Sequence, residues 1–145
     1  MSIKVEIKGI DKVTKNLDAF YKELEKEADK VLEVGASDAE GFAKRNTPVD
    51  FGKLRQQIAS EKVDKLKYRV VAGAPYSAYQ EFGTRGLVDI PEGWEDIAIY
   101  WKADPLIKMT NVPPHPFMFP AFQEISKILP KDMEKMIEDL VKKYS

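Results

Sequence analysis

Apolar residues recur at intervals of three and four positions along two long stretches, which is the spacing that places side chains on one face of an α-helix. The first stretch runs through Val13, Leu17, Phe20, Leu24, Ala28, Val31, Gly35, Ala39 and Phe42. The second runs through Ala121, Ile125, Leu129, Met133, Met136, Leu140 and Tyr144. The pattern predicts two long helices whose stripes pack in a core. For the first helix, a coiled-coil partner surface is the alternative.

Local signals refine both predicted helices. Asp11 is placed to cap the start of the first helix, and Pro48 predicts that this helix ends within a residue or two of position 46. Gly35 and Gly41 are unfavourable inside a helix, so we expect a bend or a close crossing near them. Pro130 should kink or restart the last helix, because the apolar stripe continues beyond it.

Alternating apolar and polar residues predict three strands. The first is 3–7, at a sheet edge and guarded by lysines. Segments 57–63 and 67–73 form a hairpin that turns at 64–66. The fold class is therefore α+β, with a small, mostly antiparallel sheet packed by a long N-terminal helix and a C-terminal helix.

Two further local signals fall around this hairpin. Asp50 is placed to cap a short helical turn, and Gly52 allows a tight bend without a Cβ clash. Ser77 can cap a short helix that runs to Phe82 and that Gly83 closes at its C-terminus. We expect these turns to fix the corners of the fold.

Composition narrows the class of protein. The chain has 145 residues, of which 43% are apolar and 32% charged. We therefore expect a single domain over 1–145 with a real core. Net charge is −1 and the sequence pI is about 5.9, which gives no overall attraction to nucleic acid. There is no cysteine, no signal-peptide pattern and no apolar run long enough to span a membrane.

The segment 85–114 has weak periodicity and five prolines or glycines that interrupt it: Pro91, Gly93, Pro105, Pro113 and Pro114. We predict a mobile arm, an insertion or a small extra hairpin. It carries Trp94, Tyr100 and Trp101, which we interpret as a partner-binding surface because such side chains dominate binding hot spots. The arm could instead fold back on its own domain.

Charge disfavours nucleic acid as the partner of this arm. Residues 81–104 contain six acids and two bases, a net charge of −4, which repels a phosphate backbone. Residues 53–69 contain six bases and two acids, a net charge of +4. Neighbouring copies could therefore dock head to tail, and an intramolecular balance of charge is equally open.

No catalytic, cofactor or metal site is predicted. His115 is the only histidine and lies between two prolines, without a positioning partner or metal-ligand spacing. The glycines match neither a dinucleotide fingerprint nor a phosphate loop, and no serine sits in a nucleophile elbow. An enzyme and a nucleic-acid-binding accessory module are the alternative function classes.

Three motifs, in this order, carry a resemblance: Thr47-Pro-Val-Asp-Phe-Gly-Lys-Leu-Arg-Gln-Gln-Ile58, Tyr76-Ser-Ala-Tyr-Gln-Glu-Phe-Gly-Thr84 and Pro116-Phe-Met-Phe-Pro-Ala121. The chain resembles the tail-component, or head-tail joining, family of long-tailed bacteriophages and prophages. The resemblance implies a structural virion protein that is assembled in the bacterial host cytoplasm. It also implies an oligomeric neck ring, with other neck, connector and tail-tube proteins as partners.

The motifs nominate thirteen residues: Pro48, Asp50, Gly52, Leu54, Arg55, Tyr79, Glu81, Phe82, Gly83, Pro116, Phe117, Pro120 and Ala121. Most of them are of types that more often fix the backbone than touch a partner. Arg55 and Glu81 are the charged members among apolar and backbone-shaping neighbours. We therefore expect an ion pair between them.

Overall fold

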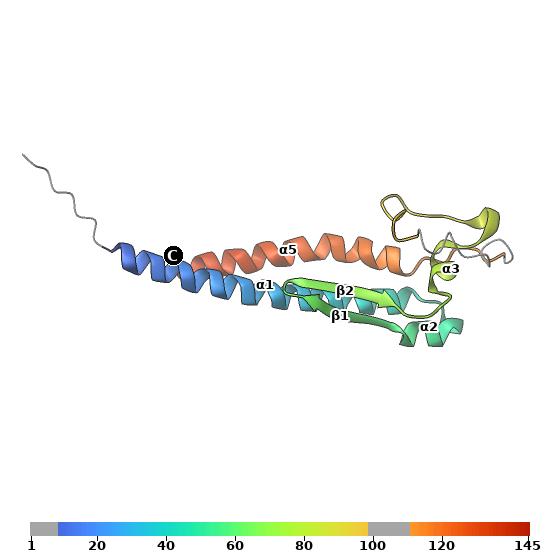
Figure 1. Ribbon diagram of the computed structural model, residues 1–145, viewed down its shortest axis with the longest axis horizontal. Coiled ribbons are helices and arrows are strands. Elements are labelled where there is room, and N and C mark those ends of the chain that lie inside the picture. The colour runs from blue at the N-terminus through green and yellow to red at the C-terminus, as the bar shows by residue number, and fades with distance from the viewer. Residues whose placement is uncertain (1–8, 99–110) are drawn as a thin grey trace, which may run out of the picture.

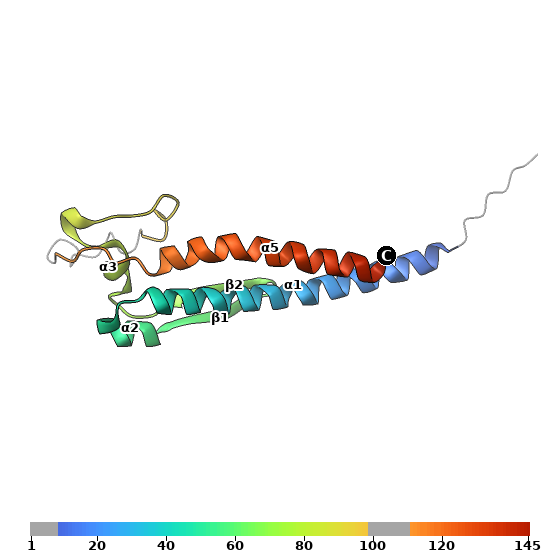
Figure 2. The ribbon, with the colours of Figure 1, turned by 180° about the vertical axis from the view of Figure 1, so that it is seen from behind.

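The computed structural model describes residues 9–98 and 111–145, and two long helices dominate it (Figure 1). Helix α1 (Ile10–Asn46) spans 37 residues and α5 (Met118–Tyr144) spans 27. They run antiparallel and side by side, as the views from the front and from behind both show (Figures 1 and 2). Both predicted helices are confirmed, and so is the end of α1 just before Pro48.

The helices approach each other closely at Gly35. A Cβ atom built there would lie 2.8 Å from Cδ1 of Leu129. Only glycine therefore permits this approach without a shift of the leucine. The expected crossing is confirmed at Gly35. At Gly41 the only close atom belongs to the flexible Arg45 side chain, at 3.4 Å. Helix α5 continues through Pro130 as one element.

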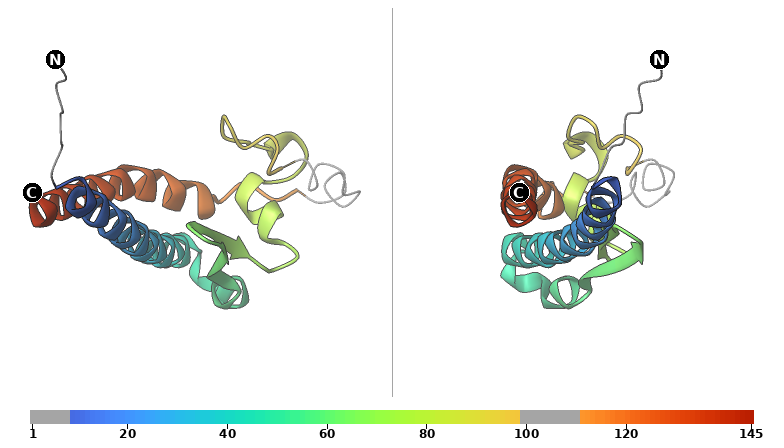
Figure 3. Two further views of the ribbon diagram at one scale, coloured as in Figure 1. Left: turned by 60° about the vertical axis from the view of Figure 1, so that its left-hand side comes forward. Right: turned by 90° about the vertical axis from the view of Figure 1, so that its left-hand side faces the viewer.

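The predicted hairpin is also present, formed by β1 (Ile58–Asp64) and β2 (Lys67–Ala72). The strands pair antiparallel, with Ile58 opposite Ala72 and an irregularity before Asp64. Both strands and α5 pack along α1, so α1 is the element that joins the layers (Figure 3). The strand predicted at 3–7 and most of the extra hairpin suggested beyond residue 97 lie outside the described residues.

Side chains of α1 hold the hairpin in place. The Glu40 carboxylate accepts from the backbone N–H of Ser60 at 2.7 Å and from its hydroxyl at 2.8 Å. Nearer the turn, Lys62 pairs with Asp29, which lowers the pKa of the Asp29 carboxyl and raises that of the Lys62 amine. These contacts set how the hairpin lies on the helix.

Short elements make the remaining corners. They are the 3₁₀ turn η1 (Val49–Phe51), α2 (Gly52–Gln56), α3 (Ser77–Phe82) and the 3₁₀ turn η2 (Arg85–Leu87). Gly83 ends α3 with a φ of 73°, as predicted.

Three predicted helix caps are wrong. Gly9, in the left-handed region, precedes α1, and Asp11 is already inside its first turn. Asp50 lies within η1 and is exposed, with no capping hydrogen bond to α2. Ser77 is the first residue of α3, and its hydroxyl donates to the Ala72 carbonyl at 3.1 Å. In each case the residue that caps the helix lies one or two positions away from the predicted cap.

The prediction for Gly52 is also wrong. Its φ is −54°, an ordinary helical value, and a Cβ atom there would meet nothing within 4 Å. The bend at this corner is made by η1 and does not need a glycine.

The core lies at one end of the molecule. Its main cluster of buried residues consists of Ala43, Leu54, Ile58, Ala74, Phe117 and Ala121. At the other end, residues 10–19 of α1 are all exposed, because α5 ends opposite Phe20 and Glu23. The expectation of a core stripe is therefore wrong for these first turns, where Val13 is 59% and Leu17 50% exposed.

Candidate protein-interaction site

The three sequence motifs meet in space at the core end of the molecule. Leu54 of the first motif and Phe117 of the third are each fully buried in the same cluster. Ala121, one helical turn after Phe117, is buried beside them. We call this region the motif junction and define it by Thr47, Leu54, Glu81 and Phe117.

Glu81 joins the second motif to the third. Its carboxylate accepts from the backbone N–H groups of Phe117, Met118 and Phe119, at 2.8, 2.9 and 2.9 Å. The first N–H groups of a helix have no partner inside the helix, and an anion there is also favoured by the helix dipole. Glu81 is 4% exposed, so it acts as a buried cap on α5.

The predicted ion pair between Arg55 and Glu81 is wrong. The Arg55 guanidinium instead donates from Nη2 to the Thr47 carbonyl at 2.9 Å. The Thr47 hydroxyl in turn donates to the Ala43 carbonyl at 2.8 Å. The Ala43 carbonyl also accepts the Thr47 backbone N–H at 3.1 Å, so Thr47 closes the end of α1 with two hydrogen bonds, and Arg55 satisfies the carbonyl of this capping residue. Glu81 and Arg55 therefore both hold the backbone at a helix end.

Gly83 lies where the arm leaves α3. Its φ is 73°, and a Cβ atom there would lie 2.9 Å from the Leu87 carbonyl oxygen and from the Pro114 ring. Both features suit glycine. Next to it, Thr84 donates its N–H to the Val112 carbonyl at 2.9 Å, while its hydroxyl accepts from the Val112 N–H at 2.7 Å. The two ends of the arm are therefore held together at the motif junction.

An apolar groove of about 520 Å³ opens beside the junction. Residues of α1, β2, α3, α5 and the arm line it, among them Ala39, Val70, Val71, Phe82, Trp94, Ile97, Phe122 and Ile125. Ser77 and Glu81 are its polar members. An apolar, concave surface with few polar groups is suited to bind apolar side chains.

Trp94 forms the arm's side of the groove. Its ring meets the rings of Phe82, Phe119 and Phe122 edge to face, at centroid distances of 6.3, 5.3 and 6.0 Å. This is a favourable geometry for aromatic pairs, so the described part of the arm packs on its own chain through Trp94. Ile97 and Phe122 nevertheless stay 60% and 54% exposed at the groove. The other nominated aromatic residues, Tyr100 and Trp101, lie outside the described residues.

The remaining nominated residues lie around the junction. Phe82 is buried against Ala98, and Tyr79 packs against the same small cluster. Pro120 sits in the first turn of α5, whereas Pro116 is exposed just before it. Pro48 precedes η1 and is half-buried.

Sequence reasoning missed several residues that organise this site: Glu40, Thr47, Gln80 and Thr84. The Gln80 carbonyl, for example, accepts from the His115 N–H at 2.7 Å. The partners of these residues are 4 to 35 positions away, and only the segment-ending Thr-Pro pair offered a local signal. The other three have no signature in the sequence.

The described residues offer no metal site, since they contain no group of three or more candidate ligands. The exposed His115 contacts only the Pro113 carbonyl through its ring, at 3.0 Å. No helix in the described part of the chain is long and apolar enough to cross a membrane.

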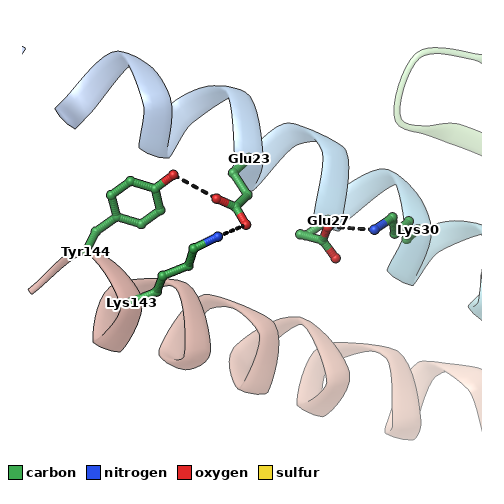
Figure 4. A network of polar contacts seen from close by, with 5 residues as sticks. All are labelled: Glu23, Glu27, Lys30, Lys143 and Tyr144. Atoms are coloured by element: carbon green, nitrogen blue, oxygen red, sulfur yellow. Dashed lines mark hydrogen bonds and ion pairs between the residues drawn. The ribbon is translucent and has the colours of Figure 1, made fainter. Parts of the chain in front are cut away.

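At the other end of the molecule, polar contacts on the surface join the helices (Figure 4). Glu23 of α1 accepts from the Tyr144 hydroxyl at 2.7 Å and pairs with Lys143. The contacts lower the pKa of the Glu23 carboxyl and raise those of Lys143 and Tyr144. Surface pairs of this kind contribute little to stability.

Half of the basic charge of segment 53–69 is paired within the chain. Lys62, Lys65 and Arg69 pair with Asp29, Glu25 and Glu61. For those three bases, this favours the alternative in which positive and negative charges balance within one chain.

Such a site, a rigid junction beside an open apolar groove, is typical of a protein that binds other proteins. Residues 11–83 match the family model described as "Bacteriophage HK97-gp10, putative tail-component". The chain belongs to this family of phage tail components, as the motif resemblance predicted. No curated protein and no solved structure matches the chain.

Proposed function

We propose that this tail component joins the head connector of a long-tailed phage to its tail, as a tail-completion or neck protein that assembles into a ring. Its partners are then neighbouring copies of itself and the adjacent connector and tail-tube proteins. The observation that carries the proposal is the open apolar groove beside the motif junction, where Ile97 and Phe122 are exposed. Exposed apolar surface at a concave site suits docking of a protein partner.

The protein works by assembly and not by catalysis. Two charged residues of its motifs hold the backbone of their own chain: Glu81 caps α5, and Arg55 donates to the Thr47 carbonyl at the end of α1. Because these side chains are hydrogen-bonded to the backbone of their own chain, their role is to stabilise the fold.

Charge also supports contacts between copies. The arm contributes four exposed acids at 89, 92, 95 and 96, and Lys53 and Lys67 form no ion pair within the described residues. Contacts between these regions of neighbouring copies would weaken as salt is raised. Assembly that is equally strong at low and high ionic strength would contradict this part of the proposal.

The arm 85–114 contacts a neighbouring subunit or ring in this proposal. Trp94 packs on its own chain. Limited proteolysis of the isolated monomer tests whether the rest of the arm is also held there without a partner. Rapid cleavage within the arm supports an arm that orders on its partner. Slow cleavage throughout 85–114 in a monomeric sample contradicts it.

Deleting the gene from a phage or prophage that carries it tests the proposed function. We expect DNA-filled heads and complete tails to accumulate unjoined, and a plasmid copy to restore infectious particles. Normal yields of joined particles after deletion would contradict the proposal. Filled heads without any tails would place the protein in the building of the tail instead.

A further inference from the structure

The first turns of α1 form a second exposed apolar surface, far from the groove. Ile10, Val13, Leu17 and Tyr21 lie on one face of the helix at spacings of three and four, and each is at least half exposed. We call this surface the tip stripe. Four such side chains display on the order of 400 Å² of apolar area, which is as much as the largest patch of an ordinary monomer.

No element that the structure describes covers the tip stripe. Helix α5 ends where Tyr144 packs edge to face on Phe20, with ring centroids 5.6 Å apart. The ten residues 10–19 extend beyond that point. At the usual rise per residue they make about 15 Å of helix. Figure 1 shows this end of α1 projecting past the C-terminal end of α5.

The apolar groove lies at the opposite end of the molecule. It is lined by the start of α5, by α3 and by the arm, which Figure 1 places furthest from the first turns of α1. One molecule therefore carries a projecting apolar surface at one end and a concave apolar surface at the other. Because the helix is rigid and continuous, the two cannot meet within one chain.

We propose that the groove of one copy receives the tip stripe of α1 from the next copy. The proposal rests on the proposed function, since a contact between two different surfaces of identical chains joins them head to tail and closes into a ring when the rotation permits. Apolar side chains of the tip stripe fill the groove beside Val71, Ile97 and Phe122.

Charge favours this pairing over a contact between two grooves. Residues 10–21, which carry the tip stripe, contain two acids and two bases and so have no net charge. Residues 86–98, next to the groove, contain four acids and no base. The acids beside two grooves therefore repel each other, whereas they do not repel the uncharged tip.

The area involved is at the low end for a protein interface, so each single contact is weak. Closure of a ring strengthens it, because the last contact forms between surfaces that are already held close together. Disulfide trapping suits such a contact, since it collects transient encounters, and the chain has no cysteine of its own.

The experiment mixes two single-cysteine variants of the full chain, Leu17→Cys and Phe122→Cys, under mild oxidation. The matched control replaces the first with Ala19→Cys, which is exposed on the opposite face of the same two turns. We expect at least tenfold more disulfide between positions 17 and 122 than between 19 and 122. Mass spectrometry of the linked peptides gives the yields.

Equal yields for the two pairs would overturn the inference. So would a 17-to-17 disulfide that predominates over 17-to-122, because the stripes would then pair with each other. The gene deletion tests the proposed function independently of the disulfide experiment. Unjoined heads and tails without any 17-to-122 disulfide would refute the inference and leave the proposed function standing.

Discussion

The two ends of this molecule are built on different principles. At the motif junction, segments far apart in the sequence share buried apolar contacts and buried hydrogen bonds, with Phe117 and Leu54 fully buried. At the tip of α1, residues 10–19 stand exposed, and the helix first meets the end of α5 through the Phe20–Tyr144 ring contact and the surface ion pair of Glu23 with Lys143. From this comparison we expect stability to be concentrated at the junction, and our proposal assigns the tip to assembly.

Phe117→Ala should show the largest effect on the junction. Removing a fully buried ring leaves a cavity, so we expect a loss of about 3–5 kcal/mol in the free energy of unfolding. Phe122→Ala, in the helix that Phe117 precedes, is the control, because its ring is 54% exposed and its loss should cost much less. Urea denaturation measures both. Equal losses would mean that burial at the junction does not dominate stability.

Glu81→Gln should come next. The amide keeps one oxygen but brings N–H donors toward the backbone N–H groups of Phe117, Met118 and Phe119. We therefore expect a loss of about 2–3 kcal/mol. Glu124→Gln, an exposed change on α5, the helix that Glu81 caps, should have little effect on the free energy of unfolding. A stability for Glu81→Gln that matches this control would refute the capping role.

Two glycine substitutions separate a required glycine from a dispensable one. Gly83 combines a φ of 73° with a position where a Cβ atom would lie 2.9 Å from backbone atoms. For Gly83→Ala we therefore expect a loss of about 2 kcal/mol. Gly52 has an ordinary φ and open space around it. Gly52→Ala should be neutral or stabilise by up to about 1 kcal/mol.

Thermal melts followed by circular dichroism decide between the two glycine variants. The reverse order of stability would contradict the assigned backbone geometry.

Glu40 lies along the body of the molecule and gives a pH-dependent effect. Hydrogen bonds from Lys44 and Ser60 lower the pKa of its carboxyl from 4.5 to about 2 in the folded chain. The ionised group therefore favours folding above pH 4.5, and this contribution is lost as the pH falls from 4.5 toward 2. Because the site is partly open to solvent, we expect a contribution of only about 1 kcal/mol.

The comparison for Glu40 is between the parent protein and Glu40→Gln over that pH range. The difference in their free energies of unfolding should shrink as the pH falls. A difference that stays constant from pH 6 to pH 2.5 would show that ionisation of Glu40 does not matter.

Lys143→Met at the tip end should show the smallest effect. The ion pair with Glu23 is solvent-exposed, so we expect no measurable change in the melting temperature. A drop as large as that of Glu81→Gln would mean that this ion pair contributes more to stability than a surface contact does.

Periodic patterns in the sequence were sufficient for both long helices, the hairpin and the role of Gly83. Each depends on residues a few positions apart, where spacing alone reports the structure. The cap of α5 was not predictable in this way, because Glu81 lies 36 positions before the N–H group of Phe117. The same limit explains the wrong pairing of Arg55, whose acceptor is a backbone carbonyl.

The exposure of the tip of α1 was not predictable from the sequence for a different reason. Val13 and Leu17 belong to the same periodic stripe as residues that α5 covers, and periodicity does not reveal where the covering helix ends. Only the position of Tyr144 against Phe20 shows that the cover stops there. The alternative of a partner surface, left open from the sequence, is the one that our proposal adopts for this part of the stripe.

The most direct test of the account measures the yield of joined particles when Leu17→Asp replaces the parent protein in a phage lacking its own copy. Ala19→Asp, which adds the same charge on the opposite exposed face, is the control. The account predicts at least a hundredfold loss of infectious particles for Leu17→Asp, an unchanged melting temperature, and a normal yield for Ala19→Asp. A normal yield for Leu17→Asp would contradict it.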